Sequence, residues 1–487
     1  MNSKAFKRKY DTLKRTFRRN VRMKNIQTNS KTVEEGDIFI AISCKNLKDN
    51  IKEAIDRKAG LIFVEEKNKE LLYDVDAKKI VFIKDARLIA SKLAKFKHNA
   101  QPNCCVCVTG TNGKSSCVHF LNQIWNLCGE ISASFGPLGL FIGGRKIENA
   151  GIKSDLTTPD PFILHKILEY LYENNVNNAV FEASSHAIEQ KRLHSVDLAA
   201  AAFTNISTDH LDYHKTKEEY LKAKASLFLE VLPKENPAVI LGDSKLICAS
   251  VKAIHKNVIT FGLDEKNDIK AYNIREYENK IVFDCDIFGR IFKNVTLNLF
   301  GRFQALNVLC ATGLACSCGA KPEEIIEILP KLKPLDGRME HIISYNNGEV
   351  YVDYAHTSEG FKNALECFKR TCPNKLICIF GCGGDRDKTK RSEMGQIAQD
   401  IADIVIVTDD NPRSEDPKSI RKEIINFCPK AIEIDDRKEA IKCGMNMLSD
   451  GDFLTITGKG CESIQIYSNK TLKHNDKEEI LKIASSH

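Results

Sequence analysis

The sequence lacks the long apolar segments of membrane proteins and of secretion signals. No apolar run reaches membrane-spanning length, and the basic stretch from Lys4 to Lys24 is followed neither by an apolar signal core nor by the acid-free pattern of a transit peptide. No internal repeat or low-complexity tract is evident. We therefore expect a cytoplasmic protein without a cleaved signal. A solvated helix face explains the basic stretch better than a surface for nucleic acid or membrane does.

Paired CxxC spacing is also missing, although the chain has 18 cysteines. Several cysteines lie inside apolar, strand-like runs such as residues 104–108. Disulfides would be typical of a small secreted domain, and paired CxxC spacing of a metal site. We interpret the cysteines as reduced, buried thiols of a cytosolic protein.

Neither sign of charge is in strong excess. The chain has 72 basic and 65 acidic residues, and its formal net charge is +7. This mild excess suits anionic small-molecule substrates and is too diffuse to indicate a nucleic-acid partner. A length of 487 residues exceeds that of one ordinary domain.

Apolar segments of strand length alternate with segments of helix length, which predicts α/β domains with mainly parallel sheets. We predict an N-terminal domain over residues 1–98, a central domain over 99–333 and a doubly wound, Rossmann-like domain over 334–487. The expected strands are 36–41, 59–64, 78–83, 178–183, 199–205, 349–354, 375–380, 403–408, 430–434 and 453–457.

A glycine-containing turn connects the apolar run at 104–108 to a helix-length segment, which is the context of a phosphate-binding loop. Backbone N–H groups at the start of a helix bind phosphate, Lys114 would reach the β and γ phosphates, and the Ser115 hydroxyl would ligate Mg²⁺. The spacing Gly-x-x-Gly-Lys-Ser is shorter than in most ATPases, and the alternative is a plain glycine turn with a surface lysine. The loop reads Gly110, Thr111, Asn112, Gly113, Lys114, Ser115 and Ser116.

Three further polar residues follow buried strands or lie in the next helix. Glu182 ends one expected strand, where a carboxylate can hold the metal that bridges ATP phosphates. His210 follows the next strand, and Lys224 lies in the helix after it. Taken singly, these residues would be interpreted as a surface acid, a turn histidine and a solvated lysine.

Together with the phosphate loop, these motifs resemble the Mur ligase family in order and approximate spacing, over nearly the whole chain. The matching segments are GTNGKSS at 110–116, EASSH at 182–186, TNISTDHLDYH at 204–214, YLKAKASLF at 220–228, GRFQALN at 301–307, DGRME at 336–340 and DYAHT at 353–357.

The resemblance implies an enzyme of peptidoglycan synthesis, and thus of cell-wall biogenesis, cell shape and division. Such an enzyme uses ATP to convert a carboxylate of a UDP-sugar peptide into an acyl phosphate, which the amine of an amino acid attacks. By resemblance, Lys224 reacts with CO₂ to form a carbamate that supports a second Mg²⁺ beside His210. Asn307 and Arg338 would contact the nucleotide.

The resemblance also implies the small-molecule substrates. Residues implied at the UDP-sugar peptide are Ser30, Thr157, Thr158, Ser184, Gln190 and Arg192. Residues implied at the incoming amino acid are Arg386, Asp410, Asn411, Pro412, Arg413, Gly458 and Glu462.

The motif Asp410-Asn411-Pro412-Arg413 decides which amino acid we expect. Within the family, the arginine that ends it accompanies meso-diaminopimelate, and lysine-adding members usually lack it. Arg386 and Arg413 could bind a carboxylate and Glu462 an ammonium group, which diaminopimelate carries at its distal end. We therefore expect meso-diaminopimelate to be added to UDP-N-acetylmuramoyl-L-Ala-D-Glu by a monomeric enzyme.

Other hypotheses remain open at this point. A lysine-adding ligase, a ligase of the D-alanyl-D-alanine dipeptide, a folylpolyglutamate synthetase and a non-catalytic Mur-like interaction protein would share much of the pattern. The sequence also departs from the family at several positions without removing a proposed catalytic group. These departures are Asn29 for aspartate, Lys31 for arginine, Pro137 for threonine, Ser358 for proline and Cys461 for histidine.

Overall fold

The computed structural model divides the chain into two units by its internal contacts, and each unit is described separately. The first unit comprises residues 1–99 and 190–195, and the second comprises 100–189 and 196–487. The basic stretch Lys4 to Lys24 lies outside the described residues. The structure describes residues 25–73, 77–148, 156–277 and 280–486.

The first unit contains a four-stranded parallel sheet in the order β1-β2-β3-β4. Phe39 and Ile62 of adjacent strands are buried against Ile51 of helix α2. The side chain of Asp85 caps helix α3 and also pairs with Lys191 at 2.7 Å. The regular elements are β1 Ile26–Gln27, β2 Ile38–Ile40, α2 Leu47–Asp56, β3 Leu61–Glu65, β4 Ile80–Ile83 and α3 Ala86–Lys97.

An eleven-stranded sheet, in the order β15-β14-β13-β12-β11-β10-β5-β9-β6-β7-β8, forms the centre of the second unit. Its parallel middle contains β5, which pairs with β9 on one side and β10 on the other. Helix α10 packs against α4, and buried apolar side chains of both helices join the same core. The strands before residue 263 are β5 Cys104–Thr109, β6 Ser132–Gly136, β7 Gly139–Ile142, β8 Arg145–Lys146, β9 Asn178–Glu182, β10 Ala200–Phe203, β11 Ala238–Leu241 and β12 Val258–Gly262.

Antiparallel strands extend both edges of this sheet. On one edge, β13, β14 and β15 pair antiparallel, and β14 alternates buried and partly exposed residues as a strand with one covered face does. On the other edge, β6, β7 and β8 do the same. The remaining elements are β13 Ile269–Glu276, β14 Ile281–Ile287, β15 Arg290–Leu297, α4 Lys114–Leu127, α5 Pro161–Glu173, α6 Ser185–Glu189, α7 Leu211–His214, α8 Lys217–Ser226, α9 Lys245–Lys252, α10 Phe303–Ser317 and α11 Pro322–Ile328.

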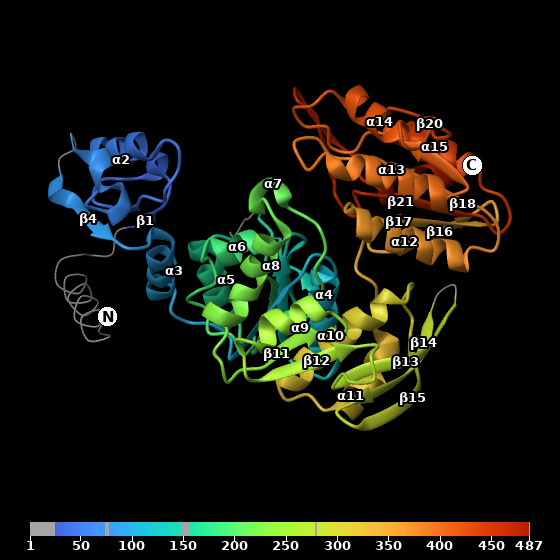
Figure 1. Cartoon of the computed structure of the whole chain (residues 1–487), viewed down its shortest axis with the longest axis horizontal. Helices are drawn as coiled ribbons and strands as arrows, with labels where there is room; N and C mark the ends of the chain where they lie inside the picture. The colour runs from blue at the N-terminus through green and yellow to red at the C-terminus, as the bar shows by residue number, and fades with distance from the viewer. Residues whose placement is uncertain (1–24, 74–76, 149–155, 278–279, 487) are drawn as a thin grey trace. The chain divides into compact units, whose positions relative to one another are not determined.

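A six-stranded sheet in the order β16-β17-β21-β18-β19-β20 occupies the C-terminal part, drawn in orange and red in Figure 1. Two apolar clusters cover it: one includes Phe361 of α12 and Met394 of α13, and the other includes Ile441 of α15 and Ile480 of α16. The elements are β16 Glu340–Tyr345, β17 Gly348–Asp353, α12 Ser358–Thr371, β18 Leu376–Phe380, α13 Thr389–Ile401, β19 Ile404–Val407, α14 Pro417–Ile425, β20 Ile432–Glu433, α15 Arg437–Asn446, β21 Phe453–Thr457, β22 Ile464–Ile466, β23 Thr471–Lys473 and α16 Asp476–Ser485.

The predicted α/β class with mainly parallel sheets is confirmed, and each expected strand has a counterpart within a few residues of its predicted bounds. The strands that were not predicted are β1, β6 to β8, β11 to β16, β22 and β23, and they include the antiparallel strands β13 to β15. All 18 cysteines are free, as expected, and they lie mostly in buried or partly buried positions.

We predict that Leu121→Ala lowers the free energy of unfolding of the second unit by about 2–5 kcal/mol. Leu121 lies in α4, is fully buried and belongs to the central core, so truncation would leave a cavity. Trp125, the single tryptophan, is buried in the same core and reports unfolding by its fluorescence in urea. Leu246→Ala, at a side chain that is 62% exposed, should change the midpoint little; an equal change in both variants would contradict the assignment of this core.

Candidate active site

The carboxyl ends of β5, β9 and β10 meet at one edge of the central sheet because the three strands are parallel neighbours. The phosphate loop follows β5, Glu182 ends β9, and Thr204 follows β10. The structure therefore brings the phosphate loop and Glu182 together, as the sequence predicted. It also adds Thr204, to which no role had been given.

Glycine is required at two positions of the phosphate loop. Gly110 has φ +148°, and a Cβ there would overlap with the Thr204 hydroxyl. Gly113 has φ +81° directly before α4, and a Cβ there would lie 2.5 Å from Asn307 Oδ1. Both positions combine a backbone conformation that favours glycine with space for hydrogen only.

Residues after β10 hold the loop in place through hydrogen bonds. Asn112 N donates to Asn205 Oδ1 at 2.8 Å, and Thr204 Oγ1 donates to Asn112 O at 2.6 Å. Thr111 Oγ1 lies 3.3 Å from the hydroxyl of Tyr220 in α8. The loop is thus preorganised at the N-terminus of α4, where a helix favours negative charge.

Lys114 is the first residue of α4, and its amine folds back over the loop. Its Nζ donates to Gly110 O at 3.0 Å and to Thr111 O at 2.8 Å. Burial lowers the pKa of Lys114, whereas the charges of Glu182 and Asp209 act in the opposite direction. A phosphate group at the loop would give this amine an anionic partner in place of two carbonyls.

Ser115 and Glu182 form the oxygen pair expected of a magnesium site. Ser115 Oγ donates to Glu182 Oε1 at 2.8 Å, and Glu182 is 3% exposed. Both side chains line a cavity of about 30 Å³ that Gly136 also borders. Within the described ranges no group of three or more His, Cys, Asp or Glu side chains is arranged to hold a metal ion. Two oxygen ligands still fit Mg²⁺, because this ion usually takes one or two protein ligands beside substrate phosphates and water.

Lys224 projects from α8 into the same edge and is 1% exposed. Its Nζ donates to Gly110 O at 2.7 Å and lies 4.6 Å from the centre of the Tyr220 ring. Burial and then the positive charge of Lys114 lower the pKa of Lys224 well below its usual value. The surroundings of this buried amine therefore favour its neutral form more than water does.

His210 lies beyond β10 with φ +53° and is the least enclosed of the four predicted catalytic residues. Its ring lies 3.5 Å from Asp209 Oδ2 and 5.1 Å, centre to centre, from the ring of His186. Partial burial lowers the pKa of His210 to about 4, so the imidazole is neutral near pH 7. A neutral imidazole can donate a lone pair to a metal.

The two residues expected at the nucleotide occupy different surroundings. Asn307 in α10 faces Gly113, and its amide donates to Gln304 Oε1 at 3.0 Å. Arg338 lies over the ring of Tyr354, 4.4 Å from its centre. Asn307 therefore borders the phosphate loop directly, and a cation–π contact holds Arg338.

Part of the set expected at the UDP-sugar peptide surrounds the end of β9. Thr158 Oγ1 donates to Glu182 O at 2.8 Å and accepts from Ser184 N at 3.0 Å. Thr157 precedes Thr158 and is partly buried. The Thr158 hydroxyl therefore links the backbone of Glu182 to that of Ser184.

The other members of that set belong to the first unit. Ser30 is buried and donates to Glu53 Oε2 at 2.7 Å. The guanidinium of Arg192 donates to Gln190 Oε1 at 2.7 and 3.2 Å. Gln190 therefore orients the arginine fork.

The loops after β19 and β21 meet, as expected for residues at one amino-acid site. Asn411 Nδ2 donates to Glu462 Oε2 at 2.9 Å, and a Cβ at Gly458 would lie 2.8 Å from Asp410 Oδ2. Arg413, with φ +53°, donates from Nη1 to Gly384 O at 2.7 Å. This bond links the loop to the glycine-rich segment after β18.

The remaining predicted residues and one unpredicted residue complete these loops. Pro412 precedes Arg413 and is buried, whereas Arg386 is exposed and donates to Asp385 O at 3.2 Å. Lys459, to which no role had been given, has a fully buried side chain and donates to Asn411 Oδ1 at 3.1 Å and Glu462 Oε2 at 3.0 Å. In the sequence, only its position between Gly458 and Gly460 indicated a role for Lys459.

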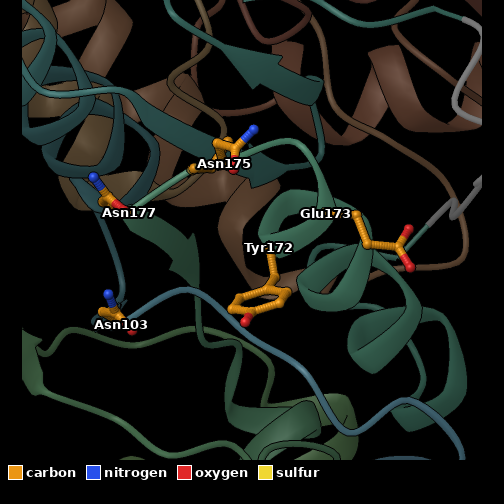
Figure 2. Close-up of a pocket in the computed structure, with 6 residues that line it drawn as sticks. Asn103, Tyr172, Glu173, Asn175 and Asn177 are labelled. Atoms are coloured by element: carbon orange, nitrogen blue, oxygen red, sulfur yellow. The ribbon is translucent and has the colours of Figure 1, made fainter.

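The cavity in Figure 2 lies at the opposite end of the strands. It measures about 320 Å³ and is lined by Asn103, before β5, and by Asn177, before β9, with Tyr172, Glu173, Asn175 and Val176. Its position at the amino ends of parallel strands separates it from the phosphate loop at their carboxyl ends. We therefore assign it no part in the site.

Two protein-family models match the chain. The Mur ligase middle domain matches residues 108–315, and the Mur ligase glutamate ligase domain matches 337–460. The chain is 40% identical over 479 residues to the UDP-N-acetylmuramoyl-L-alanyl-D-glutamate--2,6-diaminopimelate ligase of Rickettsia prowazekii, covering 95% of this chain and 96% of that protein. The chain belongs to the Mur ligase family.

Further relatives agree with that membership. The diaminopimelate ligase of Rhizobium meliloti is 39% identical over 465 residues, covering 94% of this chain and 93% of the relative. A solved UDP-N-acetylmuramoyl-L-alanyl-D-glutamate--2,6-diaminopimelate ligase is 28% identical with a TM-score of 0.66, covering 95% and 94% of the two chains. The MurF ligase of Thermotoga maritima in complex with ADP shares the fold at 20% identity and a TM-score of 0.61, covering 95% and 97%.

We predict that Gly110→Ala weakens binding of Mg²⁺-ADP at least about tenfold, a loss of about 1.4 kcal/mol, because the new Cβ forces the loop away from Thr204. Gly129→Ala is the matched control, since Gly129 also has a positive φ of +89° but nothing within 4 Å of its Cβ position. Calorimetric titration measures both affinities. Equal affinities for Gly110→Ala and the wild type would contradict the placement of nucleotide at this loop.

Proposed function

We propose that this Mur ligase uses ATP to join meso-2,6-diaminopimelate to UDP-N-acetylmuramoyl-L-Ala-D-Glu, in the synthesis of peptidoglycan. The observation that carries the proposal is the pair of sites in one chain: a phosphate loop beside Glu182 and Lys224, and an amino-acid site built from the Asp410–Arg413 and Gly458–Glu462 loops. Relatives of 38–40% identity over nearly the whole chain are named as diaminopimelate ligases.

The reaction proceeds by activation of a carboxylate. A carboxylate oxygen of the UDP-sugar dipeptide attacks the γ-phosphorus of ATP, the bond to the β-phosphate oxygen breaks, and ADP leaves. The amine of the amino acid then attacks the acyl carbon of the resulting acyl phosphate. The carbon–oxygen bond breaks, inorganic phosphate leaves with that oxygen, and the amine loses a proton to give the amide.

The first step brings a carboxylate to a polyanionic phosphate, so the site must reduce their repulsion. Lys114 and the N–H groups at the start of α4 would face the phosphates. Ser115 and Glu182 would hold Mg²⁺, whose positive charge would reduce the repulsion between carboxylate and phosphate. Asn307 borders the loop from α10, and Arg338 would contact the nucleotide from beside Tyr354.

Lys224 would serve as a carbamate. The neutral form of this buried lysine, which its lowered pKa favours, would attack CO₂ to form a carbon–nitrogen bond and release a proton. The carbamate would carry a negative charge in place of an amine that the positive charge of Lys114 disfavours as a cation. A carbamate oxygen and the neutral imidazole of His210 are ligands suited to a second Mg²⁺.

The amino-acid site offers opposite charges to a substrate with a carboxylate and an ammonium group at its far end. Arg413 and the exposed Arg386 would bind the carboxylate, and Glu462 would bind the ammonium. Lys459 neutralises one oxygen of Glu462, and Tyr354 OH lies 3.4 Å from the other. Lysine has no distal carboxylate and would leave Arg413 unpaired, so we propose discrimination in favour of diaminopimelate.

By family resemblance, the residues proposed to take part in binding the UDP-sugar dipeptide are Ser30, Thr157, Thr158, Ser184, Gln190 and Arg192. The hydroxyl of Thr158 beside Glu182 supports a position close to the phosphate loop. We propose the division into domains 1–98, 99–333 and 334–487, and a monomeric enzyme acting in the cytoplasm.

Phosphate release should require both the UDP-sugar dipeptide and diaminopimelate. Arg413→Ala should raise the KM for diaminopimelate roughly tenfold or more, because a charge-assisted hydrogen bond contributes about 1.5–3 kcal/mol. Arg370→Ala is the control. Arg370 lies in α12, which packs on the six-stranded sheet, is half-exposed and pairs with Glu276, outside the two loops of the proposed amino-acid site. Faster turnover with lysine than with diaminopimelate would contradict the specificity. No turnover with any amino acid would favour a non-catalytic role.

A carbamate on Lys224 should appear as an additional carbonyl signal in a ¹³C NMR spectrum recorded with labelled bicarbonate. The signal should be missing in Lys224→Met and should weaken as the pH falls through the lowered pKa of Lys224, because only the neutral amine reacts. Lys222→Met, on the same helix but in an exposed position, is the control. A signal that persists in Lys224→Met would assign the carbamate to another lysine.

A further inference from the structure

Arg437 is a completely buried arginine at the start of α15, and its guanidinium reaches the ends of two strands. Nη2 donates to Thr457 O, the last residue of β21, at 2.9 Å. Nη1 donates to Asp409 O, two residues beyond β19, at 3.5 Å. Both Arg437 and its ion-pair partner Asp476 have fully buried side chains. One guanidinium therefore contacts two backbone segments that are far apart in the sequence.

The position of this contact in the sheet explains why a long, forked side chain is needed. Strands β19 and β21 are not neighbours, since β18 lies between them. Adjacent strands lie about 4.8 Å apart, so the two strand ends are separated by roughly 10 Å. Ladder hydrogen bonds cannot connect strands at that spacing. The guanidinium of Arg437 instead bonds to a carbonyl on each side, with donors held in fixed directions.

Asp476, the first residue of α16, holds the guanidinium in place. Its two carboxylate oxygens accept from Arg437 Nε and Nη2, both at 2.8 Å, and Oδ1 also lies 2.8 Å from His474 Nε2. Burial would raise the pKa of Asp476, but the charge and hydrogen bonds of Arg437 lower it far below its usual value. The pair is therefore charged throughout the neutral range, and the C-terminal helix supplies the anion.

The two carbonyls belong to the residues that directly precede the two loops of the proposed amino-acid site. Asp409 precedes the Asp410–Arg413 segment, and Thr457 precedes the Gly458–Glu462 segment. Beyond these points the loops contact each other through side chains, by the bond from Asn411 to Glu462 and by the amine of Lys459. Arg437 thus links the bases of the two loops that carry Arg413 and Glu462.

We propose that Arg437, clamped by Asp476, is a positioning residue that sets the spacing of the two loops that recognise the incoming amino acid. The inference rests on the proposed function, because it concerns the substrate of the same site. Loss of the fork would displace Arg413 relative to Glu462, and binding of an amino acid with charges at both ends would weaken. Binding of ATP at the phosphate loop, which Arg437 does not contact in any of these bonds, would not depend on it.

The test compares Arg437→Lys and Asp476→Asn with a control that removes stability alone. Arg437→Lys keeps the charge but loses the fork, and Asp476→Asn keeps the shape but loses the anion. Ile441→Ala is the control: Ile441 lies one turn along α15, is fully buried against β18 and β21, and belongs to the apolar cluster instead of the loops. Melting temperature, kcat and the KM values for ATP and the amino acid are measured for each protein.

We expect the KM for diaminopimelate to rise at least about tenfold in both variants while the KM for ATP stays within about twofold, which is the pattern of a lost binding interaction at one substrate. In Ile441→Ala the melting temperature should fall with both KM values unchanged. Should Arg437→Lys not fold, Asp476→Asn supplies the same comparison, and Asp476→Glu, which retains the anion, should rescue part of the effect.

The inference would be overturned if the KM for the amino acid rose no more in Arg437→Lys and Asp476→Asn than in Ile441→Ala. Failure of the proposed function has a different signature. If the wild type preferred lysine, the specificity would be wrong, and the variants would be scored by their KM for lysine. If the wild type turned over no amino acid, the proposed function and this inference would both be wrong.

Discussion

Parallel pairing of β5 with β9 on one side and β10 on the other is the constraint on which the site depends. It places three strand ends at one edge. The turn before α4 and the start of α4 therefore meet the carboxylate of Glu182, 67 residues beyond Ser115, and the hydroxyl of Thr204, 92 residues beyond Asn112. The absence of a Cβ at Gly110 lets the loop pack against Thr204. The loop is consequently formed before any phosphate arrives, and binding does not need to order it.

Buried basic side chains are the second recurring feature, and they differ in whether a carboxylate pairs with them. Lys114 donates to loop carbonyls that a phosphate can replace, whereas Lys224 is buried beside it with a strongly lowered pKa. In the C-terminal part, Lys459 and Arg437 are matched by the carboxylates of Glu462 and Asp476. The matched cations hold loops in place, and the unmatched ones face the region where anionic groups would bind.

Much of the fold could be predicted because buried parallel strands have a plain sequence signature of continuous apolar runs followed by glycine or polar residues. The phosphate loop was predictable for the same reason, since its glycines, lysine and serine are adjacent in the chain. The antiparallel strands β13 to β15 were missed because the alternation of Ile281 to Ile287 is one of burial in the structure. In the sequence, this segment mixes apolar and acidic residues and lacks the continuous apolar run of the parallel strands.

Residues whose role depends on long-range contacts could not be predicted from the sequence. Arg437 carries no local motif: it follows two aspartates at a helix start, and only the fold brings Thr457 O and Asp476 to its guanidinium. Lys459 lies within a recognisable loop, but its complete burial between Asn411 and Glu462 is a tertiary property. The residues proposed to bind substrates come from family resemblance, and the contacts that position them come from the structure.

Labelling with oxygen-18 tests most directly whether a carboxylate of the dipeptide is phosphorylated before the amide forms. UDP-N-acetylmuramoyl-L-Ala-D-Glu labelled in the D-Glu carboxylates is incubated with ATP, Mg²⁺, diaminopimelate and the protein, and the products are analysed by mass spectrometry. If the carboxylate is phosphorylated, the released phosphate carries one labelled oxygen from the dipeptide and ADP carries none. Unlabelled phosphate, or label in AMP, would contradict it.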